Sequence, residues 1–115
     1  MTRDQLVGTW KWIGINLGGH FRPHAGGTVR LDEDGTAVVT TPMADGSTAT
    51  EAATWAYVDE SHWNLSLVIP GTPDIPGLEE ESVSMEECEV KSFAGDRMEL
   101  EKFDVEFRFV WERVR

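Results

Sequence analysis

Two histidines four residues apart, His20 and His24, come closest in type and spacing to a metal site. A pair with this spacing binds zinc when one helix face carries both rings and further cysteine, histidine or carboxylate ligands complete the site. Here both lie in the segment LGGHFRPHAGG, residues 17–27, whose four glycines and one proline disfavour a helix. We therefore expect no metal and no bound cofactor, and interpret both as loop histidines that are exposed or that contact a ligand.

Carboxylates form a second group that could do chemistry, in a run that includes residues 79–81, Glu86, Glu87 and Glu89. Two neighbouring carboxylates can act as general acid and general base when their surroundings separate their pKa values. Nothing in this spacing fixes such a pair, so we interpret the run as a solvated face. Cys88 has no basic partner to activate its thiol, and we expect it to be a small buried side chain. The chain is therefore not predicted to be an enzyme.

Aromatic side chains are the strongest indication of a binding surface, because the chain contains five tryptophans. The alternation described below places a set of aromatic residues on the inner faces of the predicted strands: Trp10, Trp12, Trp55, Tyr57, Trp63, Phe107, Phe109 and Trp111. Such rings line pockets for flat apolar molecules. Each ring also buries roughly 150–250 Å², so the same set could simply fill the interior. The residues alone leave both interpretations open.

Length and charge limit the function classes. The 115 residues suffice for one domain, 1–115, and the net charge of −11 is typical of a solvated surface that does not bind nucleic acid. A single cysteine excludes an internal disulfide. No apolar run reaches the roughly 18 residues of a membrane span, and the first residues lack a signal-peptide core. The sequence therefore predicts no membrane span and a cytoplasmic location.

A period of two in the apolar residues predicts strands along nearly the whole chain. Eight segments have this pattern: 6–15, 28–32, 36–41, 48–58, 62–69, 82–93, 97–103 and 105–114. Residues 17–27 and 70–81 are predicted loops, and Asp-Gly pairs mark hairpin turns. Short links imply antiparallel neighbours. We expect an all-β fold, an eight-stranded antiparallel up-and-down β-barrel, with a two-sheet sandwich as the alternative.

Short motifs at both ends of the chain resemble those of a known family. The stretch Leu6–Trp10 is similar to the Gly-x-Trp motif of lipocalins and other calycins, and Leu31–Thr36 resembles a turn of small bacterial lipocalin-like domains. Residues 96–100 and 107–113 resemble the final hairpin of those domains. The resemblance implies a lipocalin-like barrel in which a basic residue late in the last strand, here Arg113, packs across Trp10 as a structural floor.

Two functions are compatible with such a barrel. The first is binding of a small, mostly apolar or aromatic molecule in the barrel mouth, walled by Trp12, Trp55, Tyr57, Trp63 and Phe107. The alternative is a packed barrel that acts as a protein-interaction or assembly module without a ligand. Four apolar residues predicted on the outer wall, Ile13, Ile15, Val110 and Val114, also predict a homodimer through the first and last strands.

Overall fold

Strands account for most of the computed structural model, which describes residues 1–24, 26–69, 71, 73–77, 79–102 and 105–114. One short helix, α1 (Arg3–Leu6), precedes the following strands: β1 (Gly8–Leu17), β2 (His20–Pro23), β3 (Thr28–Leu31), β4 (Thr36–Pro42), β5 (Thr48–Asp59), β6 (His62–Ile69), β7 (Ser82–Ala94), β8 (Arg97–Glu101) and β9 (Arg108–Arg113). Within the described residues, no helix has the length and apolar character needed to cross a membrane.

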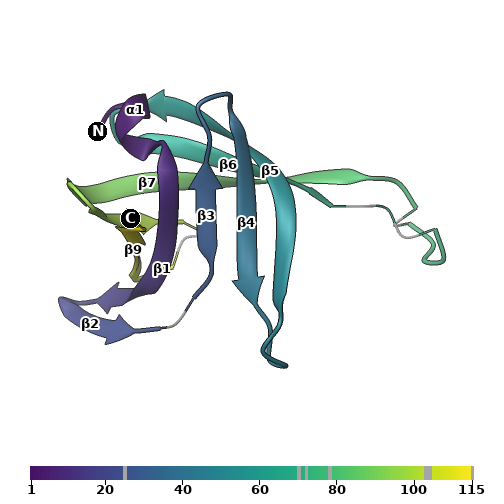
Figure 1. The fold of residues 1–115 in the computed structure, drawn as a ribbon, viewed down its shortest axis with the longest axis horizontal. Helices are drawn as coiled ribbons and strands as arrows, with labels where there is room; N and C mark the ends of the chain where they lie inside the picture. The colour runs from purple at the N-terminus through teal and green to yellow at the C-terminus, as the bar shows by residue number, and fades with distance from the viewer. Residues whose placement is uncertain (25, 70, 72, 78, 103–104, 115) are drawn as a thin grey trace.

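The strands close into a barrel because β1 pairs with both ends of the sheet. One edge of β1 pairs with β3, and its other edge pairs antiparallel with β9 from Trp10–Arg113 to Asn16–Arg108. From β3 to β9 each strand pairs with the next, so eight strands form a closed antiparallel up-and-down barrel (Figure 1). The predicted fold class is confirmed, and the sandwich alternative is excluded.

The predicted loop over residues 17–27 contains a strand, so that part of the prediction is wrong. Gly18 and Gly19 adopt positive φ angles of 58° and 85° and turn the chain back on itself. β2 then pairs with the second half of β1, from Gly14–Pro23 to Leu17–His20. The glycines that indicated a loop therefore supply the turn of a hairpin. β2 pairs with β1 but is not one of the eight strands that close the barrel.

A bulge in β1 changes which of its side chains face inward. The pairing of β1 with β9 shifts between Trp12 and Gly14, so the alternation predicted for this strand is wrong beyond Trp12. Ile15 pairs with Phe109, and both line a pocket at the end of the barrel. Gly14 moves to the outer face, where it is the cross-strand partner of Val110.

The apolar patch predicted on the outer wall is consequently broken up. Val110 is on the outer face but has no exposed surface. The ring of Phe21 lies over the neighbouring Gly14, so close that a Cβ at this glycine would be 2.8 Å from the ring. Ile15 is on the opposite face, which leaves Ile13 and the half-exposed Val114 for a contact between the first and last strands.

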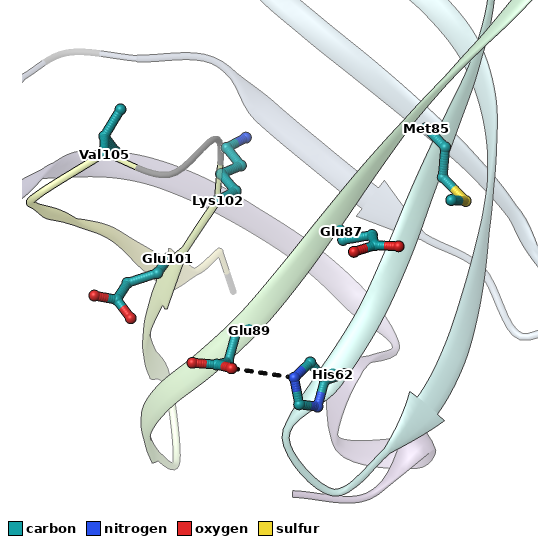
Figure 2. Close-up of a pocket in the computed structure, with 7 residues that line it drawn as sticks. All are labelled: His62, Met85, Glu87, Glu89, Glu101, Lys102 and Val105. Atoms are coloured by element: carbon teal, nitrogen blue, oxygen red, sulfur yellow. Dashed lines mark hydrogen bonds and ion pairs between the residues drawn. The ribbon is translucent and has the colours of Figure 1, made fainter.

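Among the described residues, the part of β7 that precedes Glu89 has no strand partner on the side of β8. β8 ends at Glu101 and β9 begins only at Arg108, so the predicted start of the last strand at Val105 is wrong. Pairing of β7 with β8 stops at Glu89–Glu101. Figure 2 shows Glu101, Lys102 and Val105 on one side of the resulting gap and the glutamates of β7 on the other.

The end of the barrel where β1 begins is closed by α1 and by a stacked tryptophan. Thr2 and Gln5 form a capping box at the start of the helix, a local signal for a helix that was not predicted. Trp10 Nε1 donates a 2.9 Å hydrogen bond to the carbonyl oxygen of Leu6. The Arg113 guanidinium lies 4.4 Å from the Trp10 ring centroid, and its nitrogens donate to the carbonyl oxygens of Val7 and Gln5.

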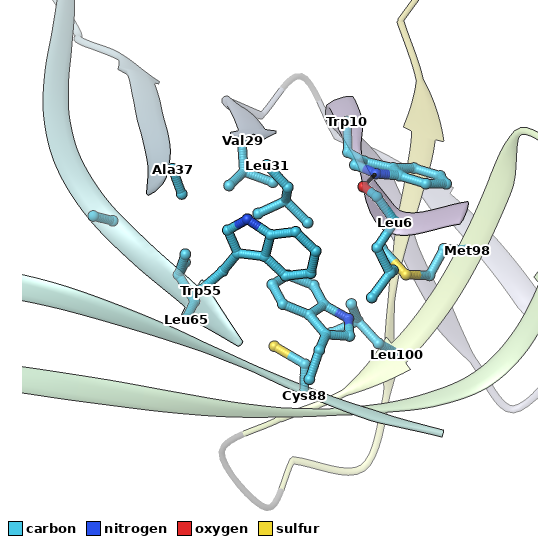
Figure 3. Packing of buried hydrophobic residues seen from close by; sticks show 12 residues of the cluster. Leu6, Trp10, Val29, Leu31, Ala37, Trp55, Leu65, Cys88, Met98 and Leu100 are labelled. Carbon is cyan, nitrogen blue, oxygen red and sulfur yellow. Dashed lines mark hydrogen bonds between the residues drawn. The ribbon is translucent and has the colours of Figure 1, made fainter. Parts of the chain in front are cut away.

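Large apolar side chains fill the half of the barrel next to this floor (Figure 3). Buried residues from α1 and most strands form one cluster: Leu6, Trp10, Val29, Leu31, Ala37, Ala53, Trp55, Trp63, Leu65, Cys88, Met98 and Leu100. Trp10 and Leu6 have no exposed surface at all. The closed end is therefore a packed core, and any ligand pocket must lie elsewhere.

Replacing Trp10 by alanine tests the floor. We expect Trp10→Ala to lower the free energy of unfolding by about 3–5 kcal/mol, because it removes a fully buried ring together with the Arg113 stack. Arg113→Ala should also destabilise the barrel, whereas Val58→Ala, at a half-exposed site, should change stability by less than about 0.5 kcal/mol. Urea unfolding measures all three, and a wild-type midpoint for Trp10→Ala would contradict the floor.

Candidate functional site

The open end of the barrel, opposite α1, carries an apolar pocket. Its volume is about 270 Å³, and its lining comes from β1, β2, β9 and the chain before β3 and β9: Trp12, Ile15, Arg22, Pro23, His24, Phe107 and Phe109. We call this the mouth pocket. It brings together side chains that are more than 80 residues apart in sequence, because β1 and β9 are neighbours.

Four rings of the mouth pocket form a connected aromatic cluster. The ring centroids of Trp12 and Phe109 are 5.6 Å apart, and those of Phe109 and Phe107 are 5.2 Å apart. His24 lies on the other side of Trp12, with its ring centroid 4.4 Å away. All three pairs are tilted, an arrangement in which ring edges meet ring faces. Such a cluster suits a flat apolar guest.

Trp12 is held rigidly at the centre of this cluster. Its Nε1 donates a 2.7 Å hydrogen bond to the carbonyl oxygen of Gly14. The backbone of Gly26 lies against the indole, since a Cβ at this glycine would be 2.4 Å from a ring carbon. Backbone hydrogen bonds from Trp12 to Gly27 and from Gly26 to Trp12 fix the facing segment. The pocket wall is therefore preorganised, which reduces the entropy lost on binding.

The histidines lie in different surroundings. His24 is exposed, and its ring packs on Trp12. It therefore lies where a histidine can contact a ligand in the mouth pocket. His20 begins β2 opposite Leu17 and is exposed. Among the described residues, no three histidine, cysteine, aspartate or glutamate side chains are grouped so that they could hold a metal ion.

The structure separates the five residues predicted to wall the mouth. Trp12 and Phe107 line the mouth pocket. Trp55 lies near the floor, where its Nε1 donates to the carbonyl oxygen of Asp32 at 2.8 Å and Arg3 stacks on its ring. Tyr57 Oη donates to the carbonyl oxygen of Met1 at 3.4 Å. Trp63 is buried in the core.

Sequence reasoning missed several residues of the mouth pocket. Phe109 was placed on the inner face but not assigned to the mouth. Ile15 was assigned to the outer face because the bulge in β1 has no clear signature in the sequence. Arg22, Pro23 and His24 belong to a segment taken as a loop. Their place follows from the pairing of β2 with β1, which depends on the whole barrel.

A smaller cavity lies inside the barrel, with a volume of about 110 Å³. Its lining is apolar except at one edge: Val29, Val39, Trp63, Leu65, Leu67, Glu86, Cys88, Leu100, Lys102 and Trp111. Lys102 Nζ forms a largely buried 3.1 Å salt bridge with Glu86, and it lies 4.9 Å from the ring centroid of Phe109. Because Lys102 lines this interior cavity and Phe109 lines the mouth pocket, the two pockets are neighbours.

A polar groove runs along the outside of the gap in the wall. Its volume is about 640 Å³, and Figure 2 shows its lining residues: His62, Met85, Glu87, Glu89, Glu101, Lys102 and Val105. His62 Nδ1 is 2.9 Å from Asp59, and His62 Nε2 is 3.2 Å from Glu89. Hydrogen bonding to Asp59, with help from Glu89, raises the pKa of His62 above its ordinary value of 6.5.

This arrangement predicts a pH dependence of stability. Because folding raises the pKa of His62, the protonated ring stabilises the native state fully below about pH 6.5, the unfolded value. The stabilisation is lost as pH rises through the folded pKa. We expect the urea midpoint of the wild type to fall over this window, and His62→Gln to remove that fall. An identical pH profile for both proteins would contradict the assignment.

Cys88 is an inert part of the core. It is 2% exposed, and burial raises the pKa of its thiol to about 12. Because only the thiolate reacts, we expect an aromatic disulfide reagent at pH 8 to modify native protein far more slowly than urea-unfolded protein. Equal rates in the two states would show that the thiol is accessible and that this part of the core is open.

Comparison with known proteins places the fold. No known family model and no curated protein matches this chain. A solved lipocalin-like protein from Bacteroides uniformis superposes with a TM-score of 0.66 at 12% identity, covering 96% of this chain and 99% of that one. An uncharacterized protein from Bacteroides eggerthii has a TM-score of 0.63 at 12% identity, with 95% and 99% covered. These similarities confirm a lipocalin-like barrel fold for the chain.

Proposed function

We propose that this barrel binds a small, flat, mostly apolar molecule in the mouth pocket. The observation that carries the proposal is the aromatic cluster of Trp12, His24, Phe107 and Phe109 around an open volume of about 270 Å³. These rings lie outside the buried core, with Phe109 packed against its edge. They offer a guest the apolar faces and edges that favour stacking.

The size of the mouth pocket supports one class of guest. Pockets for drug-sized ligands have volumes of roughly 300–1,000 Å³. The mouth pocket is at the lower limit, and the interior cavity of about 110 Å³ adds no room for a long chain. One or two fused aromatic rings suit this space better than a fatty acid. Arg22 at the rim can face a polar substituent that points to solvent.

The packed-barrel alternative also has support in the structure. The core fills the floor half of the barrel, and Val83 and Met85 on β7 are 68% and 55% exposed. Exposed apolar residues on one strand can serve as a contact for another protein. We favour ligand binding because Trp12, at the centre of the mouth pocket, is positioned by a hydrogen bond and by close packing.

The proposal is tested by titrating 2-naphthol into the protein and measuring its dissociation constant by calorimetry. Phe107→Ala should weaken binding roughly two- to thirteenfold, since one aromatic contact contributes about 0.5–1.5 kcal/mol. Tyr57→Phe is the matched control, because it alters an aromatic residue at the opposite end of the barrel. It should leave the dissociation constant unchanged.

Two outcomes would contradict the proposal. One is the absence of saturable binding by a wild-type protein whose unfolding shows that it is folded, which would favour the interaction module. The other is binding that Phe107→Ala leaves intact and Tyr57→Phe weakens, which would place the ligand at the floor. Decanoate, tested in parallel, should bind more weakly than 2-naphthol if the pocket selects flat rings.

A further inference from the structure

Among the described residues, the outer groove and the interior cavity share Lys102 as a lining residue, and we call the border between them the side opening. Among the described residues, the part of β7 that precedes Glu89 pairs only with β6. Lys102 lines the outer groove, as Figure 2 shows, and it also lines the interior cavity. Its salt bridge with Glu86 on β7, which also lines the cavity, lies at this border. Such a contact can open without breaking any strand pairing.

Two tryptophans that line this cavity have indole N–H groups without an acceptor among the described residues. Trp63 and Trp111 both line the cavity, and the Nε1 atom of each is buried without a hydrogen-bond partner among the described residues. Roughly nine in ten buried polar groups in proteins are paired, because an unpaired donor destabilises the fold. Nε1 of Trp10, Trp12 and Trp55 follows this rule, each donating to a backbone carbonyl oxygen. The two exceptions, Trp63 and Trp111, both line the interior cavity.

The charges around the side opening disfavour an anion. Among the described residues, four carboxylates surround it, against two ammonium groups and the His62 ring: Glu86, Glu87, Glu89 and Glu101, with Lys91 and Lys102. Lys102 already faces Glu86, and Lys91 faces Glu89 and Glu101. A carboxylate or phosphate would meet net repulsion along this route, whereas a neutral molecule would not.

The volume of the interior cavity limits the guest further. A dry protein cavity of about 150 Å³ can hold benzene. The interior cavity has about 110 Å³, so it fits a smaller molecule with only a few non-hydrogen atoms. Leu65, Leu67 and Leu100 would contact the alkyl part of that molecule, and the indole N–H groups would contact its polar part.

We propose that the interior cavity is a second binding site, for a small neutral molecule with a hydrogen-bond acceptor such as the carbonyl group of a short ketone or amide. The molecule reaches the cavity through the side opening when the Glu86–Lys102 contact opens. Trp63 and Trp111 donate to its carbonyl oxygen. This site is distinct from the mouth pocket, so it neither requires nor excludes an aromatic ligand there.

The five tryptophan side chains provide a direct test by nuclear magnetic resonance. Their indole N–H signals, in 15N-labelled protein, are assigned with single Trp→Phe variants. Acetone should shift the signals of Trp63 and Trp111 saturably, while those of Trp10 and Trp55 stay in place. Acetate has the same number of non-hydrogen atoms and carries a charge, so it should produce no saturable shift at equal ionic strength. The signal of Trp12 reports separately on the mouth pocket.

Glu86→Gln tests the charge selection and has a matched control. Removing this carboxylate beside Lys102 should allow acetate to shift the two signals, whereas Glu81→Gln, outside the groove, should not. Dispersed signals from all five tryptophans show that each variant is folded. The proposal is overturned if acetone leaves Trp63 and Trp111 unmoved, if all five signals move together, or if acetate acts like acetone on the wild type. If acetate leaves the signals of Trp63 and Trp111 unmoved in Glu86→Gln, the proposed selection of neutral molecules by charge is overturned.

Discussion

The pairing of the first long strand with the last one is the constraint on which the rest of this structure depends. Hydrogen bonds between β1 and β9 close the sheet, and closure removes the exposed edges of an open sheet. The same strand pair places Arg113 over Trp10 at one end and, beyond the bulge between Trp12 and Gly14, Phe109 beside Ile15 at the other. Floor and mouth pocket are thus two ends of a single strand pair.

The tryptophans divide according to what their indole nitrogens contact. Trp10, Trp12 and Trp55 donate to backbone carbonyls and are anchored in place. Trp63 and Trp111 bury their nitrogens beside a cavity without an acceptor. In a small core, anchored rings stabilise the fold, while unsatisfied donors reduce stability unless they serve a ligand. Burial alone would not have separated these two groups.

The sequence predicts the barrel well because alternation and turn residues are local signals. The number of barrel strands and their antiparallel order both follow from short windows of sequence. Two features fail because they depend on distant residues. The bulge at Ile13 depends on the pairing of β1 with β9, and the strand at 20–23 forms only because β1 extends far enough to pair with it. The mouth pocket contains both features, so its membership could be predicted only in part.

A crystal structure of the protein grown with 2-naphthol would locate the guest rather than report affinity alone. We expect electron density for the fused rings between Trp12 and Phe107, with the hydroxyl directed toward solvent and with Trp12 unmoved. Ring density at the floor beside Trp55, or an unoccupied mouth pocket in crystals that contain the bound compound elsewhere, would contradict binding in the mouth pocket.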